Sequence, residues 1–247
     1  ANIAHSGFDL GNGGGIACNF ETNDVEITGN MIRGNYAGDQ GGGIWDRGVD
    51  PGNVIRENII EGNRCHVAGA GVSLGWGSFL AENLIFGNIS DSFGAGVYLF
   101  DGVPRIERNT IVDNYNDNSF PHGAGIHIRE GSPKIIANIV AGNRGLASSG
   151  VGLLCASSKQ PVIECNDAWG NEGGDYLCYG ACDTTGSKNL SVDPLFCDPQ
   201  QRDYQLDALS PCGGLDGDCG LIGAFPVACG GTQVRNGTWG RLKAHFR

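Results

Sequence analysis

Several features that mark large protein classes are missing from this sequence. It contains no run of about 20 apolar residues, so no transmembrane helix is predicted. It also lacks a Gly-X-Y period, helical heptads, a phosphate-binding loop and a dinucleotide-binding fingerprint. Positive charge is scarce, because 16 Lys and Arg stand against 27 Asp and Glu. The net charge of −11 argues against nucleic acid as a partner, and a polyanion would need a local basic groove.

Glycine and cysteine are abundant instead. The chain has 43 Gly, more than twice the usual share of roughly 7%, and ten Cys. Metal sites favour C-x-x-C pairs, whereas the closest pair here is Cys178 and Cys182. We therefore expect disulfides with at most two free thiols, an oxidising compartment, and neither a metal nor another cofactor. Metal binding is the alternative, and the disulfide connectivity is left open.

A glycine motif repeats along the first two thirds of the chain. It has the pattern G-x-G followed by an apolar residue, and the final glycines are spaced by 25 to 29 residues. The six copies end at Ile16, Ile44, Val72, Val97, Ile126 and Leu153. This period is too short for a βαβ unit, which takes about 30 residues or more, and it fits one coil of three short strands.

A second motif, N-x4-N, recurs between the glycine motifs. Its pairs are Asn30/Asn35, Asn58/Asn63, Asn83/Asn88, Asn109/Asn114, Asn138/Asn143 and Asn166/Asn171. Apolar residues stand three positions before and two positions after each first Asn. In stacked coils each such column lies on itself. The pattern therefore predicts Ile and Val columns in the core, hydrogen-bonded Asn ladders, and Gly columns that supply positive φ at the corners.

These repeats, residues 13–171, resemble the right-handed parallel β-helix repeat superfamily, which includes pectate-lyase-like proteins. Asp193-Pro194-Leu195-Phe196 and the segments Tyr204–Leu206, Ser210–Cys212 and Gly223–Phe225 resemble the closing coils of secreted bacterial members. The resemblance implies an all-β solenoid, a right-handed single-stranded parallel β-helix of about seven to nine coils, over residues 1–229. It does not specify an activity, because the superfamily spans lyases, hydrolases, epimerases, adhesins and non-enzymatic surface proteins.

The two ends of the chain depart from the repeat. Asn2 precedes Gly15 by the same 13 residues that separate Asn30 from Gly43, so the chain is expected to begin in mid-coil, as a mature form or a fragment. Residues 230–247 form a basic tail with four Lys and Arg and no acid. This tail is either frayed or a docking segment. An open first coil and a basic tail together suggest head-to-tail assembly into a ring or filament.

An outward face follows each G-x-G motif, because side chains alternate on a strand. Its first column includes Trp45, Tyr98 and His127, and its second includes Arg47, Phe100 and Arg129. These six residues are the candidate ligand-binding residues, because aromatic faces stack on sugar rings and Arg grips carboxylates or hydroxyls. Asp101 and Glu130 lie at the strand ends. A simpler interpretation is that such residues only cover a sheet face, where aromatics are common.

Two functions from different classes fit this face. The first is an extracellular or cell-surface scaffold that binds a polysaccharide or a surface protein. The alternative is a polysaccharide lyase with His127 or Arg129 as base, or a glycoside hydrolase with Asp101 and Glu130 as its two carboxylates. No catalytic motif of the superfamily maps onto the chain residue by residue, so the scaffold is the first expectation.

Overall fold

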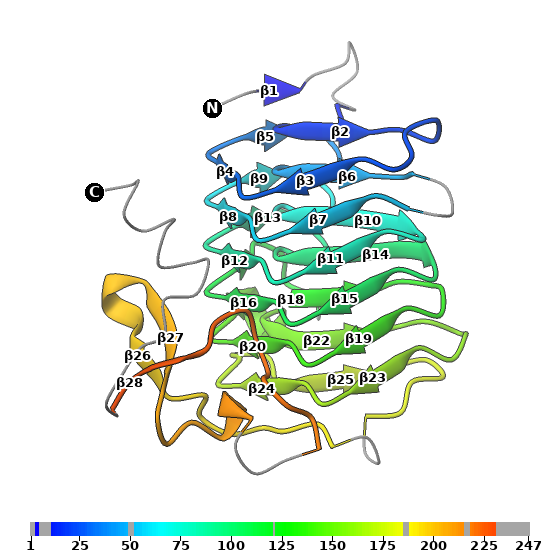
Figure 1. The fold of residues 1–247 in the computed structure, drawn as a ribbon. Coiled ribbons are helices and arrows are strands. Elements are labelled where there is room, and N and C mark those ends of the chain that lie inside the picture. The colour runs from blue at the N-terminus through cyan, green and yellow to red at the C-terminus, as the bar shows by residue number, and fades with distance from the viewer. Residues whose placement is uncertain are drawn as a thin grey trace.

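The computed structural model describes residues 3–4, 11–48, 52–120, 122–184, 188–214 and 218–230. Within them, the chain winds around one axis as a stack of parallel coils (Figure 1). A complete coil holds four short strands, not the three expected, because each of its two Asn positions makes a corner of its own. No helix of the described residues is long and apolar enough to cross a membrane.

Strands of successive coils pair in register and build four parallel sheets, which we name A to D. Sheet A holds β1 (Ile3–Ala4), β5 (Tyr36–Ala37), β9 (Arg64–Cys65), β13 (Ile89–Ser90), β17 (Tyr115–Asn116) and β21 (Arg144–Gly145). Sheet B holds β2 (Ile16–Cys18), β6 (Ile44–Asp46), β10 (Val72–Trp76), β14 (Val97–Gly102), β18 (Gly123–Ile128), β22 (Val151–Cys155) and β25 (Tyr176–Cys178).

The other two sheets lie between the Asn corners. Sheet C holds β3 (Glu26–Thr28), β7 (Val54–Arg56), β11 (Phe79–Ala81), β15 (Arg105–Glu107), β19 (Lys134–Ile136) and β23 (Val162–Glu164). Sheet D holds β4 (Met31–Arg33), β8 (Ile59–Glu61), β12 (Leu84–Phe86), β16 (Thr110–Val112), β20 (Ile139–Ala141) and β24 (Asp167–Trp169). The all-β solenoid is thus confirmed, with six or seven strands in each described sheet.

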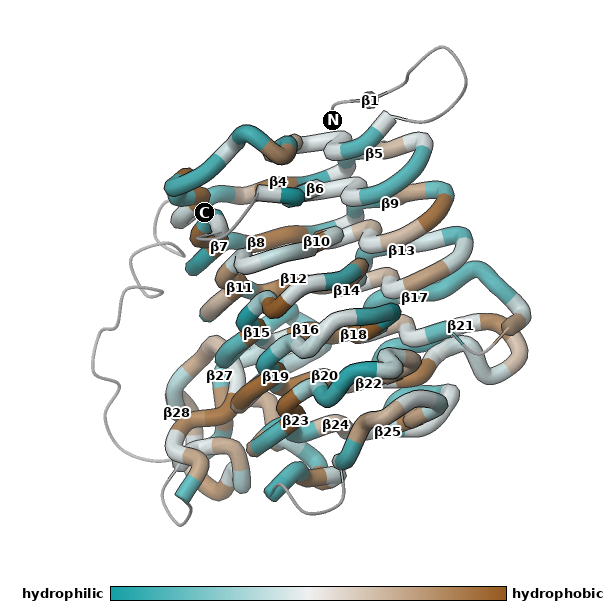
Figure 2. Tube along the Cα trace, turned by 90° about the vertical axis from the view of Figure 1, so that its right-hand side faces the viewer, coloured by the Kyte–Doolittle hydropathy of each residue, from teal (hydrophilic) through white to brown (hydrophobic). Residues whose placement is uncertain are grey.

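The apolar columns predicted from the repeat form the core. Ile106 stacks between Leu80 and Ile135 in sheet C, and Ile111 stacks between Ile85 and Val140 in sheet D. These side chains are completely buried and belong to one continuous cluster that runs through the stack. Hydrophobic and hydrophilic residues alternate along the chain in each coil (Figure 2). Full burial of such a side chain stabilises the fold by about 1.5–3 kcal/mol.

Both Asn ladders are present. The Oδ1 atom of Asn109 accepts hydrogen bonds from the main-chain N and the Nδ2 of Asn83, at 3.0 and 2.9 Å. Its own Nδ2 donates to Oδ1 of Asn138 at 2.9 Å and to the carbonyl of Leu80 at 3.0 Å. The second ladder repeats this pattern and ends on the carboxylate of Asp175, which accepts from Asn171. From Asn58 and Asn63 onward, each ladder amide is therefore hydrogen-bonded on both sides.

The glycine columns match the expectation of positive φ only in part. The final Gly of each G-x-G motif has no positive φ. A Cβ at Gly96 would instead lie 2.6 Å from the carbonyl oxygen of Gly125 in the next coil, so close backbone approach excludes a side chain there. Positive φ occurs at the first glycine of several motifs and at the residue before each ladder Asn. Some of those residues are not glycine, among them Arg108 and Asp113.

The last part of the chain does not add closing coils. Residues 191–214 and 218–230, which we call the C-terminal unit, contain β26 (Phe196–Asp198), β27 (Asp203–Asp207) and β28 (Val227–Cys229), a separate three-stranded sheet. The unit lies beside β12, β16, β20 and β24 on the outer face of sheet D (Figure 1). Because the unit leaves the stack, the coil count falls slightly below the expected seven to nine.

Short 3-10 turns complete the described secondary structure. They are η1 (Leu146–Ser148), η2 (Pro199–Gln201) and η3 (Pro211–Gly213). The proposed boundary of a tail at residue 230 remains a prediction, because residues 231–247 lie outside the described residues.

Six of the ten cysteines form disulfides. The pairs are Cys155–Cys182, Cys165–Cys219 and Cys197–Cys229, and the second pair ties the last coils to the C-terminal unit. Disulfide formation is as expected, but the limit of two free thiols is wrong, because Cys18, Cys65, Cys178 and Cys212 are free. Cys18, Cys65 and Cys212 are buried. Cys18 packs in the core as a small apolar side chain, whereas the thiols of Cys65 and Cys212 lie within hydrogen-bond distance of Ser90 and Asp167.

Candidate functional site

The outer face of sheet B carries the residues singled out in the sequence. Trp45, Ser73, Tyr98, His127 and Leu154 are neighbours in register on successive strands, as the alternation predicts. This column is not open to solvent, however. Tyr98 and His127 are only 3% and 5% exposed. The turns that lead from sheet A to sheet B cover them from one side.

A groove runs along this covered column. Its volume is about 500 Å3, and it is lined by Gln40, Val67, Phe93, Tyr98, His122, His127, Arg129, Leu154, Ala156 and Tyr179. These residues come from six successive coils, whose strands span roughly 20–25 Å along the axis at about 4.8 Å per coil. The shape suits an extended chain better than a compact small molecule.

Sequence reasoning missed the wall formed by Val67, Phe93 and His122. A signal for it is present, because Phe93 and His122 each stand immediately before a G-x-G motif, in the same column as Gln40 and Ala68. The rings of Phe93 and His122 lie 4.2 Å apart, and the ring of Phe93 meets His127 edge-on at 5.2 Å. Aromatic contacts of this kind fix the wall against the sheet.

Two arginines meet over one aromatic ring beside the groove. The guanidinium groups of Arg47 and Arg129 lie 3.9 and 4.9 Å from the centroid of the Phe100 ring. Arg47 also lies 5.8 Å from the rings of Trp45 and Phe20. The structure thus brings together all six candidate ligand-binding residues, since Arg129 also hydrogen-bonds Tyr98 and follows His127 by two positions on the same face.

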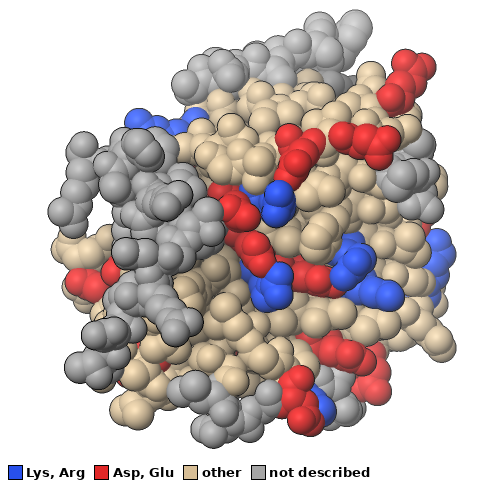
Figure 3. Space-filling view, in the orientation of Figure 1, with Lys and Arg blue, Asp and Glu red and all other residues tan. Residues whose placement is uncertain are grey.

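The ion pairing of these two arginines differs from that of the arginines on sheet C. On sheet C, Arg and Glu side chains alternate in direct ion pairs such as Arg56–Glu26 at 2.6 Å (Figure 3). Among the described residues, Arg47 and Arg129 form no ion pair, although the carboxylate of Asp39 acts on Arg47 from a distance. Burial lowers the pKa of Arg47, and the positive charge of Arg129 adds to this. Two neighbouring guanidinium groups without a direct ion pair are a feature that an anion site would need.

His127 is a neutral side chain under physiological conditions. Burial lowers its pKa to about 3, and the charges of His122 and Arg129 add to this effect. Its Nδ1 atom is buried without a hydrogen-bond partner among the described residues. A general base works best with a pKa near the operating pH, so this environment does not suit His127 to that role.

The two candidate carboxylates are already engaged. Asp101 forms an ion pair with Lys159 at 3.0 Å, and hydrogen bonds from Lys159 lower the pKa of Asp101. The main-chain N and the hydroxyl of Ser158 donate to Glu130 and lower its pKa. A glycosidase needs one carboxylic acid with a raised pKa, and neither group has that property here. Within the described residues, no group of three or more His, Cys, Asp or Glu could hold a metal ion.

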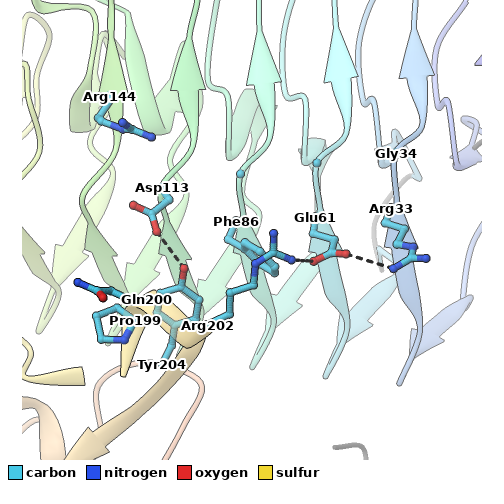
Figure 4. Close-up of a pocket in the computed structure, with 12 residues that line it drawn as sticks. Arg33, Gly34, Glu61, Phe86, Asp113, Arg144, Pro199, Gln200, Arg202 and Tyr204 are labelled. Carbon is cyan, nitrogen blue, oxygen red and sulfur yellow. Dashed lines mark hydrogen bonds and ion pairs between the residues drawn. The ribbon is translucent and has the colours of Figure 1, made fainter. Parts of the chain in front are cut away.

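A second cavity, of about 780 Å3, separates sheet D from the C-terminal unit (Figure 4). Glu61 lies between Arg33 and Arg202, at 3.7 and 3.3 Å, and the hydroxyl of Tyr204 donates to Asp113 at 2.9 Å. These contacts join residues far apart in sequence and hold the unit on the stack. They engage part of the polar lining, namely Arg33, Glu61, Asp113, Arg202 and Tyr204.

Comparison with known proteins agrees with the architecture. A family model described as a right-handed beta helix region matches residues 1–168. No curated protein and no solved structure matches the chain.

Proposed function

Because the chain belongs to the right-handed β-helix family, whose shared fold carries many unrelated activities, we propose a function from the site itself. The protein is an extracellular or cell-surface scaffold that binds an acidic glycan along the groove of sheet B without cleaving it. The observation that carries the proposal is the pair of guanidinium groups over Phe100, without carboxylate partners, at the side of an elongated groove.

Each part of this site matches a part of such a ligand. Arg47 and Arg129 supply planar donors for a carboxylate, and Phe100 and Trp45 supply apolar faces for sugar rings. The groove has the length for several consecutive sugar units. Three disulfides support an oxidising, extracellular compartment.

The other sequence-based hypotheses lack such an observation. The environment of His127 does not favour it as a lyase base, and those of Asp101 and Glu130 do not favour a hydrolase. A lyase with Arg129 as base stays the alternative prediction. Binding to a surface protein and head-to-tail assembly remain predictions, because the basic tail that suggested them lies outside the described residues.

A binding assay with matched variants tests the proposal. We expect the protein to bind pectate or alginate but not neutral dextran, and to bind more weakly as salt is raised. Arg47→Ala should weaken binding at least tenfold. The control Arg105→Ala removes an exposed guanidinium that is paired with Glu107 on sheet C, and it should leave affinity unchanged.

Three results would contradict the proposal: no binding to either acidic polymer, equal binding to dextran, or equal losses in the two variants. Product analysis in the same samples decides against the scaffold if unsaturated uronates or new reducing ends accumulate.

A further inference from the structure

Three cysteines gather at the end of the stack where sheet B finishes. Cys155 is the last residue of β22, and Cys178 is the last residue of β25, the final strand of that sheet (Figure 1). Cys155 forms a disulfide with Cys182, whereas Cys178 is a free and exposed thiol. A free thiol and a disulfide in one small cluster are the two reactants of thiol–disulfide exchange.

The register of the two strands makes Cys178 an alternative partner for Cys155. The two residues are directly paired across parallel strands, which lie about 4.8 Å apart. Side chains at paired positions of parallel strands point to the same side of the sheet. Disulfides join Cα atoms about 4.4–6.8 Å apart, and the Cα atoms of the present Cys155–Cys182 pair are 6.3 Å apart. Both other cysteines are therefore within bonding range of Cys155.

The burial of Cys155 restricts which free thiol can reach its sulfur. Cys155 is completely buried and belongs to the core cluster of the stack, so a thiol in solution has no access to it. Cys178 occupies the next position of the same column, and the main-chain N of Tyr179 donates to the carbonyl of Cys155 at 2.8 Å. At this sulfur the arrangement therefore favours a neighbouring thiol of the same molecule over an outside one.

We propose that Cys178 exchanges with Cys182 as the disulfide partner of Cys155. The Cys178 thiol loses its proton to water, and the thiolate attacks the sulfur of Cys155. The bond between Cys155 and Cys178 forms as the bond between Cys155 and Cys182 breaks, and the Cys182 thiolate takes up a proton. One disulfide and one thiol stand on each side of this step, so it needs no oxidant or reductant.

The surroundings of Cys178 determine the rate of the exchange. Burial raises the pKa of the Cys178 thiol, and the charge of Asp183 adds to this effect, whereas the hydrogen bond with Thr184 opposes it. Only a small thiolate fraction is therefore present near neutral pH. Because the thiolate is the attacking form, the exchange is expected to take minutes to hours.

The exchange changes what holds the segment that follows β25. In the exchanged form β25 is linked to β22, and the segment is no longer tied to the core through Cys182. Tyr179 belongs to this segment and lines the groove of sheet B. The exchange therefore acts at one end of the groove, although the chemical step itself does not depend on what the groove binds.

A count of free thiols in two variants tests the alternative bond. The wild type has four free cysteines, three of them buried. Cys182→Ser removes the present partner of Cys155, and we expect Cys155 to pair with Cys178. Under denaturing conditions this variant should then show only the three thiols that are buried in the native protein, whereas five remain if no bond forms. Cys178→Ser is the control, because it keeps the Cys155–Cys182 bond.

Peptide mapping of the wild type tests the exchange itself. The native protein is incubated at mildly alkaline pH without reductant, quenched with acid and denatured, and its free thiols are then labelled with a maleimide. We expect label on both Cys178 and Cys182. In Cys178→Ser, which lacks the attacking thiol, no label should reach Cys182. The Cys197–Cys229 disulfide is the internal control and should stay unlabelled, because the register partner of Cys229 is not a cysteine.

Each contrary result has a definite meaning. Five thiols in Cys182→Ser would overturn the alternative bond. In the wild type, label on Cys178 alone would overturn the exchange, and label on Cys155 would mean that Cys178 pairs with Cys182 instead. Label on Cys182 in Cys178→Ser would exclude Cys178 as the attacking thiol. No glycan is present in these measurements, so they are independent of the proposed function.

Discussion

The stack of coils and the C-terminal unit are stabilised in different ways. In the stack, each position repeats: Asn109 bonds an Asn above and below, and Ile106 packs on an apolar residue in each neighbouring coil. In the C-terminal unit no position repeats. Individual contacts with sheet D hold it in place. In one of them the main-chain N of Ala224 donates a hydrogen bond to the hydroxyl of Thr110 at 3.0 Å, and the Cys165–Cys219 disulfide adds a covalent link.

This difference determines how each region responds to change. A residue in a column is coupled to two neighbours of its own kind, so one substitution disturbs three coils. A contact of the C-terminal unit has one partner, so its loss affects only the docking of the unit. The same stack also supports the groove, because its lining comes from six coils held in register.

The largest expected effect is in a column. Asn109→Leu removes acceptors from Asn83 and donors from Asn138 and Leu80, all buried, and each unpaired group costs about 1–3 kcal/mol. We expect a loss of about 5 kcal/mol in the free energy of unfolding, or failure to fold.

Asn118→Leu is the matched control. Asn118 lies in a loop, and within the described part of the chain its side chain donates to the carbonyl of Asp91 at 3.3 Å and accepts from the main-chain N of Phe120. Its loss should cost less than about 1 kcal/mol. Denaturant unfolding of both variants checks this, and equal midpoints would refute the importance of the ladder.

An intermediate effect is expected where the C-terminal unit meets the last coil. Asp167 on β24 is fully buried, and its Oδ2 lies 3.2 Å from the thiol sulfur of Cys212. Burial raises the pKa of Asp167 from 3.8 to about 6, and the charges of Asp175 and Asp193 act in the same direction. Burial also raises the pKa of Tyr176 and of the Cys212 thiol at this junction, and the charge of Asp167 adds to both shifts.

The direction of the pH dependence of stability follows from the raised pKa of Asp167. The folded protein binds this proton more tightly than the unfolded chain, so its contribution is complete below about pH 4 and is lost as the pH rises through about 6. The difference between the ordinary pKa of 3.8 and the raised pKa of about 6 corresponds to about 3 kcal/mol in the free energy of unfolding. Asp167→Asn should remove this pH dependence.

The rate at which a thiol reagent labels Cys212 in the native protein measures opening of the unit. Labelling should accelerate from pH 4 to pH 7 in the wild type, after correction for the reactivity of the thiol with pH. If the corrected labelling rate of Asp167→Asn rises with pH as steeply as that of the wild type, this carboxyl group does not have the proposed role.

The stack of coils could be predicted from the sequence, because residues that repeat at one coil length lie above one another in the stack. The Ile, Val and Asn columns around Ile106 and Asn109 all follow from spacing. The fourth strand did not follow, since β17 and its equivalents are only two residues long and carry no pattern of their own. The place of the C-terminal unit also did not follow, because it depends on contacts between segments about 100 residues apart.

One signal for that unit was nevertheless present. Strands of sheet D are apolar on both faces, as in Leu84, Ile85 and Phe86, and an outer apolar face needs a cover. For the site, alternation placed Trp45, Tyr98 and His127 in one column correctly. It could not show that this column is covered, because the cover depends on how the turns pack against the sheet, and alternation along a strand does not report such contacts.

The smallest expected effect concerns a position where the two regions meet. Asp113 stands in a corner column of the stack where the other coils have glycines with positive φ, among them Gly87 and Gly142. Asp113 adopts φ of 55° and accepts the hydroxyl hydrogen bond of Tyr204 in the C-terminal unit. The left-handed conformation costs a non-glycine residue about 1 kcal/mol, and the hydrogen bond returns about as much.

A double-mutant cycle separates these two contributions. Asp113→Gly should be nearly neutral in the wild type, because relief of the backbone offsets the lost hydrogen bond. Tyr204→Phe alone should cost about 1 kcal/mol. In the Tyr204→Phe background there is no hydrogen bond to lose, so Asp113→Gly should stabilise the protein by about 1 kcal/mol. If Asp113→Gly has the same effect in both backgrounds, measured by denaturant unfolding, then the aspartate does not hold the C-terminal unit, and its presence in a glycine column has no structural reason at this contact.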